Sequence, residues 1–239
     1  MNNKTCDIHA HLVPAVDDGA KDFTMAIQML QTAYEQGINS IVCTSHSYGN
    51  TDLYFRNLEK LQKEVKNAGI NINLYSGCEI YCNSKIIKII IAELNNKEIP
   101  TINNTEYVLI EFNPYEDANE ILSCVKELHN NGYKTILAHT ERYLNLFGND
   151  KWIAALEEIG CLFQVNAYSI QDTVDMYNRV FARKLLKEQR VAFIGSDAHR
   201  TNHRPYMIKN GINYMNEHYD AEYVKNICYR NAKNILNIK

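Results

Sequence analysis

The sequence predicts an α/β fold in which seven mostly parallel strands alternate with helices and form a β/α barrel. Short apolar segments rich in β-branched residues alternate with segments of helical periodicity along the 239 residues, which is typical of parallel sheets with right-handed crossovers. Almost every apolar segment ends in a histidine or an acidic residue. No linker rich in Pro, Gly or Ser divides the chain, so we expect residues 1–239 to form a single domain.

The expected elements follow from periodicity and from helix-ending glycines. The strands are expected at residues 6–11, 40–44, 73–79, 107–111, 134–138, 161–165 and 191–196. The helices are expected at residues 23–36, 53–68, 85–94, 116–131, 152–159, 177–189, 205–218 and 221–236. In the first helix Met25, Met29 and Ala33 recur at helical spacing, and Gly37 follows as a C-cap, a common way for a helix to end.

Polar side chains at the strand ends favour a barrel over an open, doubly wound sheet. They are His9, His11, His46, Glu79, Glu111, His139, Asp197 and His199. In a barrel the carboxyl ends of the strands converge on one mouth, where barrel enzymes carry out their chemistry. In an open sheet these side chains would be spread along an edge.

The same residues form a candidate metal site. His9 and His11 lie two positions apart on a strand, so their side chains share one face and can bind one ion. Each polar residue alone has an ordinary structural explanation, such as a helix cap or a buried hydrogen bond. Together with Asp18 they supply five histidines and four carboxylates, enough for three divalent ions. With no cysteine among them, the set favours manganese or iron, and catalytic zinc stays open.

Composition argues against several classes of partner. Basic and acidic residues number 25 and 28 and are well mixed, for a net charge of −3, so nucleic acid is not indicated. We expect no signal peptide, because the first residues run directly into a predicted strand, and no apolar run reaches membrane-spanning length. The seven cysteines show no disulfide framework. We therefore expect a cytoplasmic protein without direct membrane insertion.

A set of motifs from Cys6 to Arg204 resembles the PHP (polymerase and histidinol phosphatase) superfamily. They are His9-x-His11, Asp17-Asp18-Gly19, Thr44-Ser45-His46, Gly77-Cys78-Glu79, Ile110-Glu111-Phe112, Ala138-His139-Thr140-Glu141-Arg142 and Ser196-Asp197-Ala198-His199. Within the superfamily the sequence is most similar to the manganese-dependent protein-tyrosine phosphatases of bacterial capsule and exopolysaccharide clusters, the CpsB/YwqE-like group.

The resemblance implies a distorted seven-stranded, TIM-like PHP barrel with a centre of three Mn²⁺ ions. The implied ligands are His9, His11, Asp18, His46, Glu79, Glu111, His139, Asp197 and His199. Arg142 and Arg204 stand where the family places its phosphate-binding arginines. The implied substrate is the phosphotyrosine tail of a cognate bacterial tyrosine kinase that controls polysaccharide assembly.

The expected reaction is metal-assisted hydrolysis of a phosphate monoester, with His46 as one possible proton donor. A thiol-based phosphatase is not indicated, because no cysteine has an arginine six positions later. The main alternative is a small-molecule phosphatase of the histidinol-phosphate type on the same metals. A metal-dependent nuclease and a catalytically silent metal-binding partner of the kinase are weaker alternatives.

The loop after His46 departs from the family. It reads Ser47-Tyr48-Gly49-Asn50, where relatives often carry a basic residue or a second histidine. The substrate-facing loop is therefore expected to be less cationic. Tyr48, Phe112 and Tyr143 could form an aromatic wall for a phenyl ring, although packing in the core or at the rim is the expected role of any one of them.

Overall fold

The protein is described by a computed structural model that covers residues 4–46, 49–172 and 175–238. The strands are β1 (Cys6–Ala10), β2 (Ser40–Cys43), β3 (Asn73–Ser76), β4 (Glu79–Tyr81), β5 (Tyr107–Glu111), β6 (Lys134–Leu137), β7 (Leu162–Asn166) and β8 (Val191–Gly195). The α-helices are α1 (Phe23–Glu35), α2 (Thr51–Asn67), α3 (Ile87–Asn95), α4 (Ala118–Asn130), α5 (Asp150–Ile159), α6 (Met176–Lys187), α7 (Lys209–His218), α8 (Ala221–Lys225) and α9 (Asn231–Ile235). Short 3-10 segments are η1 (Ile102–Asn104), η2 (Thr140–Arg142) and η3 (Ala167–Ile170), and η4 (Asn226–Arg230) is a π-helical turn between α8 and α9.

All paired strands are parallel, so the predicted α/β class is confirmed. The strands form a three-stranded sheet in the order β1-β2-β3 and a five-stranded sheet in the order β4-β5-β6-β7-β8. The two sheets are joined by hydrogen bonds at two places. The Glu79 N–H at the start of β4 donates to Thr44 O just after β2 at 2.8 Å, and the Asp197 N–H just after β8 donates to His9 O on β1 at 2.8 Å. Full closure into one barrel stays a prediction.

The third expected strand, residues 73–79, divides into β3 and β4 at Gly77. A Cβ atom at Gly77 would lie 2.7 Å from Val42 Cγ1, so only glycine permits this close approach to β2. The Gly77 N–H donates to the Tyr54 hydroxyl at 2.9 Å instead of to a neighbouring strand. The expected count of seven strands is therefore corrected to eight, in two sheets, over the described residues.

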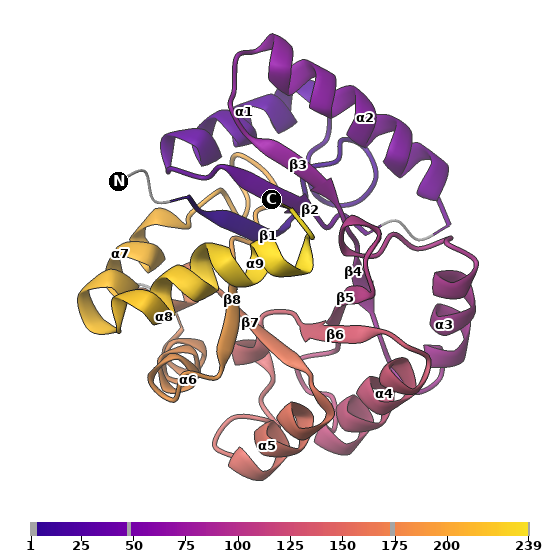
Figure 1. Ribbon diagram of the computed structural model, residues 1–239, viewed down its shortest axis with the longest axis vertical. Coiled ribbons are helices and arrows are strands. Elements are labelled where there is room, and N and C mark those ends of the chain that lie inside the picture. The colour runs from indigo at the N-terminus through magenta and orange to yellow at the C-terminus, as the bar shows by residue number, and fades with distance from the viewer. Residues whose placement is uncertain (1–3, 47–48, 173–174, 239) are drawn as a thin grey trace.

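Helices surround the strands, and the last of them covers the amino ends of the strands (Figure 1). The inward faces of the strands form an apolar cluster that includes Ile8, Leu109 and Phe193. Ile235 and Leu236 at the end of α9 pack into this cluster. Apolar side chains thus fill much of the interior toward the amino ends of the strands.

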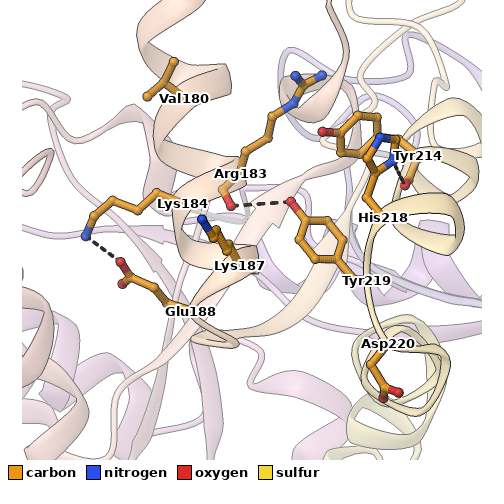
Figure 2. A pocket seen from close by; sticks show the side chains of 9 residues that line it. All are labelled: Val180, Arg183, Lys184, Lys187, Glu188, Tyr214, His218, Tyr219 and Asp220. Carbon is orange, nitrogen blue, oxygen red and sulfur yellow. Dashed lines mark hydrogen bonds and ion pairs between the residues drawn. The ribbon is translucent and has the colours of Figure 1, made fainter.

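The hollow shown in Figure 2 lies between α6 and the C-terminal part of α7, and none of the nine predicted metal ligands lines it. Its volume is about 860 Å³. Arg183 stacks at 4.2 Å over the Tyr214 ring and donates to Ile170 O at 2.7 Å. The arginine therefore ties α6 to α7 and η3, which is a structural role. Within the described part of the chain, no helix combines the length and apolar character needed to cross a membrane.

Candidate metal centre

The structure brings all nine predicted ligands together at the carboxyl ends of the strands. Glu79 at the start of β4 lies at the centre of the group and is nearly fully buried. Its Oε2 atom lies 3.1 Å from both His9 Nε2 and His11 Nε2, and its Oε1 atom lies 2.9 Å from His139 Nε2. One carboxylate therefore joins imidazoles from β1 and from the end of β6.

The remaining ligands flank this centre on two sides. On one side Glu111, at the end of β5, lies 3.7 Å from His46 Nε2 and 3.5 Å from His139 Nε2. On the other side His199 Nε2 lies 3.5 Å from Asp18 Oδ1. Asp18 belongs to the loop after β1 and is half exposed. The site is thus buried at its base and open to solvent at its rim.

Donor atoms from seven of the nine residues form three overlapping groups in the described part of the chain, each with all donors within 4.8 Å of one another. The groups are His9–His11–Glu79–Asp197, His11–Asp18–His46 and His46–Glu79–Glu111. His139 and His199 lie beside them, in contact with Glu79 and Asp18. Nitrogen and oxygen donors of this mixture suit divalent ions such as manganese, iron and zinc. The donor set therefore fits a site for divalent metal.

Four of the five imidazoles are held through Nδ1, so that Nε2 faces the cluster. His9 and His11 contact Gln164 Oε1 at 3.1 Å and Asp17 Oδ2 at 2.7 Å. His46 and His199 donate from Nδ1 to the carbonyl oxygens of Glu79 and Asp197 at 2.7 and 2.9 Å. Such partners orient metal-binding histidines in known sites. Among the described residues, the buried Nδ1 of His139 has no hydrogen-bond partner.

The electrostatics favour anionic carboxylates in the cluster. Burial disfavours the charged form of Glu79, but His9, His11 and His139 outweigh it and hold its pKa well below the usual value. Burial and Arg142 oppose protonation of His139, yet the neighbouring carboxylates raise its pKa to about 9. Carboxylates that stay ionised in a buried site require positive charge beside them. His11 and His139, whose pKa values are raised, supply it here in their protonated forms, and cations can replace those protons.

Both predicted phosphate-binding arginines reach the cluster. Arg142, in η2 after β6, donates from Nη2 to Asp197 Oδ2 at 2.7 Å and to the Tyr168 hydroxyl. Arg204 donates to Asp18 Oδ2 at 3.1 Å. The side chains of Arg142 and Arg204 are 21% and 33% exposed, so each guanidinium is accessible at the rim.

Three site residues adopt left-handed backbone conformations. His139, Asp197 and Arg204 have φ angles of 33°, 53° and 47°. Such angles are uncommon for residues other than glycine and cost free energy unless surrounding contacts compensate. The Asp197 N–H and the His199 N–H are held by His9 O and Arg204 O at 2.8 and 2.9 Å. The turns after β6 and β8 therefore direct these side chains inward.

Sequence reasoning assigned no role to several residues that contact the site. Asp17 holds His11 and also accepts the His46 N–H at 2.8 Å. Gln164 and Asn166 on β7 contact His9 and Asp197. Arg200, for which no role was assigned, donates to Asp18 O at 2.9 Å and so holds the Asp18 loop. The available signal was polarity, because Gln164 and Asn166 are amides in an otherwise apolar strand.

Two of the three residues considered for an aromatic wall, Phe112 and Tyr143, do not line the site. Phe112 and Tyr143 are buried in the core and pack edge to face, with ring centroids 6.4 Å apart. The Tyr143 hydroxyl accepts the Phe112 N–H at 3.1 Å. These rings support the turn that carries Arg142, and the expectation of core packing is the correct one for them. Tyr48 lies outside the described residues, as does Ser47.

Comparison with known proteins confirms the resemblance. A family model for capsular polysaccharide synthesis, CpsB/CapC, matches residues 5–237. Tyrosine-protein phosphatase CpsB of Streptococcus agalactiae serotype III is 29% identical over 240 residues, covering 96% of this chain and 97% of that protein. The putative tyrosine-protein phosphatase CapC of Staphylococcus aureus is 34% identical over 214 residues, covering 87% of this chain and 82% of that protein.

A solved structure shows the same fold. It comes from the crystal structures of YwqE from Bacillus subtilis and CpsB from Streptococcus pneumoniae, described as unique metal-dependent tyrosine phosphatases. The match has a TM-score of 0.86 at 25% identity and covers 97% of this chain and 94% of the solved one. With the family model spanning nearly the whole sequence, the chain belongs to the CpsB/CapC family of capsular polysaccharide synthesis.

Proposed function

We propose that this chain is a metal-dependent protein-tyrosine phosphatase that acts on the phosphotyrosine tail of a cognate bacterial tyrosine kinase in capsule or exopolysaccharide synthesis. The observation that carries the proposal is the meeting of two accessible guanidinium groups, Arg142 and Arg204, with a convergent cluster of histidines and carboxylates. The names of the relatives, tyrosine-protein phosphatases CpsB and CapC, support it. We further propose that residues 1–239 form one phosphatase domain and that it acts in the cytoplasm, where its seven free, buried cysteines would stay reduced.

In this proposal the nine clustered side chains hold three divalent ions, with Mn²⁺ as the favoured metal and iron or zinc as the alternatives. Bound ions of this kind act as Lewis acids and lower the pKa of water to near neutrality. Arg142 and Arg204 bind the phosphoryl oxygens, because a guanidinium offers paired donors and keeps its charge at all relevant pH values. Asp197 and Asp18 hold the two arginines before substrate binds.

The position of His46 favours a ligand role over a proton-donor role. Its Nδ1 lies 2.7 Å from the carbonyl oxygen of Glu79, and a carbonyl can only accept, so the hydrogen is on Nδ1. With this hydrogen on Nδ1, a neutral ring would present the lone pair of Nε2 to the cluster, and Nε2 lies 3.7 Å from Glu111. Donation to a leaving tyrosine oxygen would require the protonated ring, and a phenolate with a pKa near 10 needs less proton assistance than an alkoxide.

The rim of the site favours a protein substrate over histidinol phosphate. Leu144, two residues after Arg142, is 43% exposed, and Tyr115 is 75% exposed. The two segments are held together by the Leu144 N–H, which donates to Pro114 O at 3.0 Å. Exposed apolar side chains beside a phosphate-binding arginine suit a peptide that extends beyond the phosphotyrosine, whereas a small substrate would be enclosed.

The deciding experiment measures hydrolysis of a phosphotyrosine peptide and of histidinol phosphate by metal-stripped protein, before and after addition of MnCl₂. Wild-type protein, Arg142→Ala and the surface control Arg179→Ala are compared. We expect Mn²⁺ to restore hydrolysis of the peptide in the wild type and the control, and Arg142→Ala to stay at least about 100-fold slower. Turnover that survives stripping contradicts the metal mechanism, and turnover confined to histidinol phosphate moves the substrate to the alternative class.

A further inference from the structure

Strand β7 supplies none of the nine predicted ligands, yet it places two amide side chains beneath them. Gln164 and Asn166 are two residues apart, so both point to the same face of β7, and both are fully buried. A buried amide is costly unless its donors and acceptors find partners. Among the described residues, the hydrogen-bond partners of these two amides lie within the site or on β7 itself.

The orientation of the Gln164 amide is fixed by the backbone. The His139 N–H lies 2.8 Å from Oε1 of Gln164, and an N–H can only donate, so this atom must be the amide oxygen. The amide nitrogen of Gln164 then faces Oδ1 of Asn166 at 2.8 Å and donates to it. The nitrogen of Asn166 in turn faces Oδ2 of Asp197 at 3.1 Å. The direction of each bond follows from the one before it.

The two ends of this chain of hydrogen bonds act on different parts of the site. At one end the Gln164 oxygen also lies 3.1 Å from His9 Nδ1, so His9 must carry a hydrogen on Nδ1, and in the neutral ring the lone pair of Nε2 then faces the cluster. At the other end Oδ2 of Asp197 accepts from both Asn166 and Arg142. Only Oδ1 of Asp197 is then directed toward His9 Nε2, at 3.5 Å.

We propose that Gln164 and Asn166 are positioning residues that set the tautomer of His9 and the orientation of Asp197 together, and so tie the phosphate-binding Arg142 to the metal ligands. The inference rests on the proposed metal-dependent phosphatase function. Gly195 on the neighbouring strand supports it independently, because a Cβ there would lie 2.7 Å from the Gln164 nitrogen and 2.8 Å from His9 Cβ. Only glycine at position 195 therefore leaves room for the Gln164 amide.

The test uses two variants of similar shape that cannot form the hydrogen bonds, Gln164→Met and Asn166→Leu, with their double variant. Gln62→Met is the matched control, since the Gln62 amide donates at 2.9 Å to a main-chain oxygen, Leu74 O, which belongs to none of the predicted ligands. We expect Gln164→Met to weaken Mn²⁺ binding about 10- to 100-fold, the usual effect of removing a partner of a metal-binding histidine. We expect Asn166→Leu to raise KM for a phosphotyrosine peptide more than it lowers kcat, because Arg142 loses its oriented partner.

The double variant separates one connected chain from two independent contacts. If the chain is connected, removing Gln164 already frees Asn166, and the double variant will lose about as much Mn²⁺ affinity as Gln164→Met alone. Losses that multiply overturn the proposal, as does wild-type Mn²⁺ affinity in Gln164→Met. Circular dichroism of the metal-free variants checks folding. Should Gln164→Met fail to fold, Gln164→Asn, which shortens the side chain and keeps the amide, takes its place with the same expected loss.

A spectroscopic measurement keeps this inference separate from the proposed function. In metal-free wild-type protein at alkaline pH, long-range ¹H–¹⁵N spectra of the His9 ring should show the Nδ1–H tautomer, and Gln164→Met should lose that preference. An Nε2–H tautomer in the wild type overturns the positioning role even if the enzyme is an active phosphatase. If the expected tautomer is found but Mn²⁺ does not support hydrolysis of phosphotyrosine, the positioning role is supported and the proposed function is contradicted.

Discussion

The two ends of the same strands differ sharply in what their inward faces carry. Toward the amino ends, Ile8, Val42, Leu109, Ile136 and Phe193 pack against one another and against α9. Toward the carboxyl ends, the same faces carry ionisable groups: Glu111 follows Leu109 by two residues on β5, and Asp197 follows Phe193 by four. Alternation along β5 keeps Leu109 and Glu111 on one face, and the left-handed turn after β8 directs Asp197 toward His9.

The contrast shows how stability and chemistry are divided along each strand. The apolar half needs no partner beyond itself, because burying aliphatic and aromatic groups is favourable. The polar half is satisfied only by pairing among its own members, as around Glu79. Changes at the carboxyl ends should therefore remove activity and leave the metal-free fold intact, and changes at the amino ends should do the reverse.

The largest effect is expected from Glu79→Gln. The substitution keeps the shape but removes the charge that faces His9, His11 and His139. We expect kcat/KM for a phosphotyrosine peptide to fall about 1,000-fold or more, since electrostatic terms of this kind dominate catalysis, and Mn²⁺ content by mass spectrometry to fall with it. The exposed Glu59→Gln is the control. Activity within tenfold of the wild type would contradict the assignment of the chemistry to the carboxyl ends of the strands.

At the opposite end, Phe193→Ala should cost about 3–5 kcal/mol of unfolding free energy, the usual price of emptying a buried aromatic site. Phe193 is 1% exposed within the apolar cluster under the site. Urea titration measures the loss, and Ile89→Ala on α3, where Ile89 is 57% exposed, should cost far less. The activity of the folded fraction should match the wild type. A large fall in kcat with unchanged stability would show that the two halves are not separate.

Much of this organisation could be predicted from sequence, because it depends on local periodicity and on the geometry of parallel strands. The strand at residues 107–111 has the expected bounds, and the expected strand-end residues do meet. The convergence needed no knowledge of side-chain contacts, since parallel strands bring their carboxyl ends together whatever their sequence. The roles of the meeting residues as ligands stay a prediction.

What sequence could not predict depends on contacts between distant residues. The break at Gly77 depends on Val42 and on the Tyr54 hydroxyl. The helix expected at 205–218 begins only at Lys209, because the side chain of Gln36 accepts the N–H groups of Ile208 and Lys209 and donates to Tyr206 O. A glutamine 170 residues away leaves no local signal.

A smaller effect is expected where the last helix is fastened over the amino ends. Asn103 donates from its side chain to Leu236 O at 2.8 Å and has a φ of 49°. Asn103→Gly should lose only the hydrogen bond, about 1 kcal/mol, and Asn103→Ala should lose about 2 kcal/mol because alanine also strains in the left-handed region. Urea titration of both variants measures the difference. Equal losses would mean that the backbone conformation contributes nothing.

The smallest effect should come from a histidine outside the site. Burial, and to a lesser degree Lys134, lower the pKa of His129 below its ordinary value, and its Nε2 accepts the Thr135 N–H at 3.3 Å. The folded protein then binds fewer protons than the unfolded chain as pH falls below about 6.5, so this residue costs stability on acidification and nothing above neutrality.

We therefore expect His129→Gln to reduce the loss of unfolding free energy between pH 7.5 and pH 5 relative to the wild type, by less than the Asn103 effect. Urea titrations at the two pH values measure it. The site histidines contribute equally to both proteins and cancel in the comparison. A steeper loss of unfolding free energy in the variant would contradict this prediction. It would mean that the folded protein favours the protonated ring of His129, as it does that of His139 beside the carboxylates.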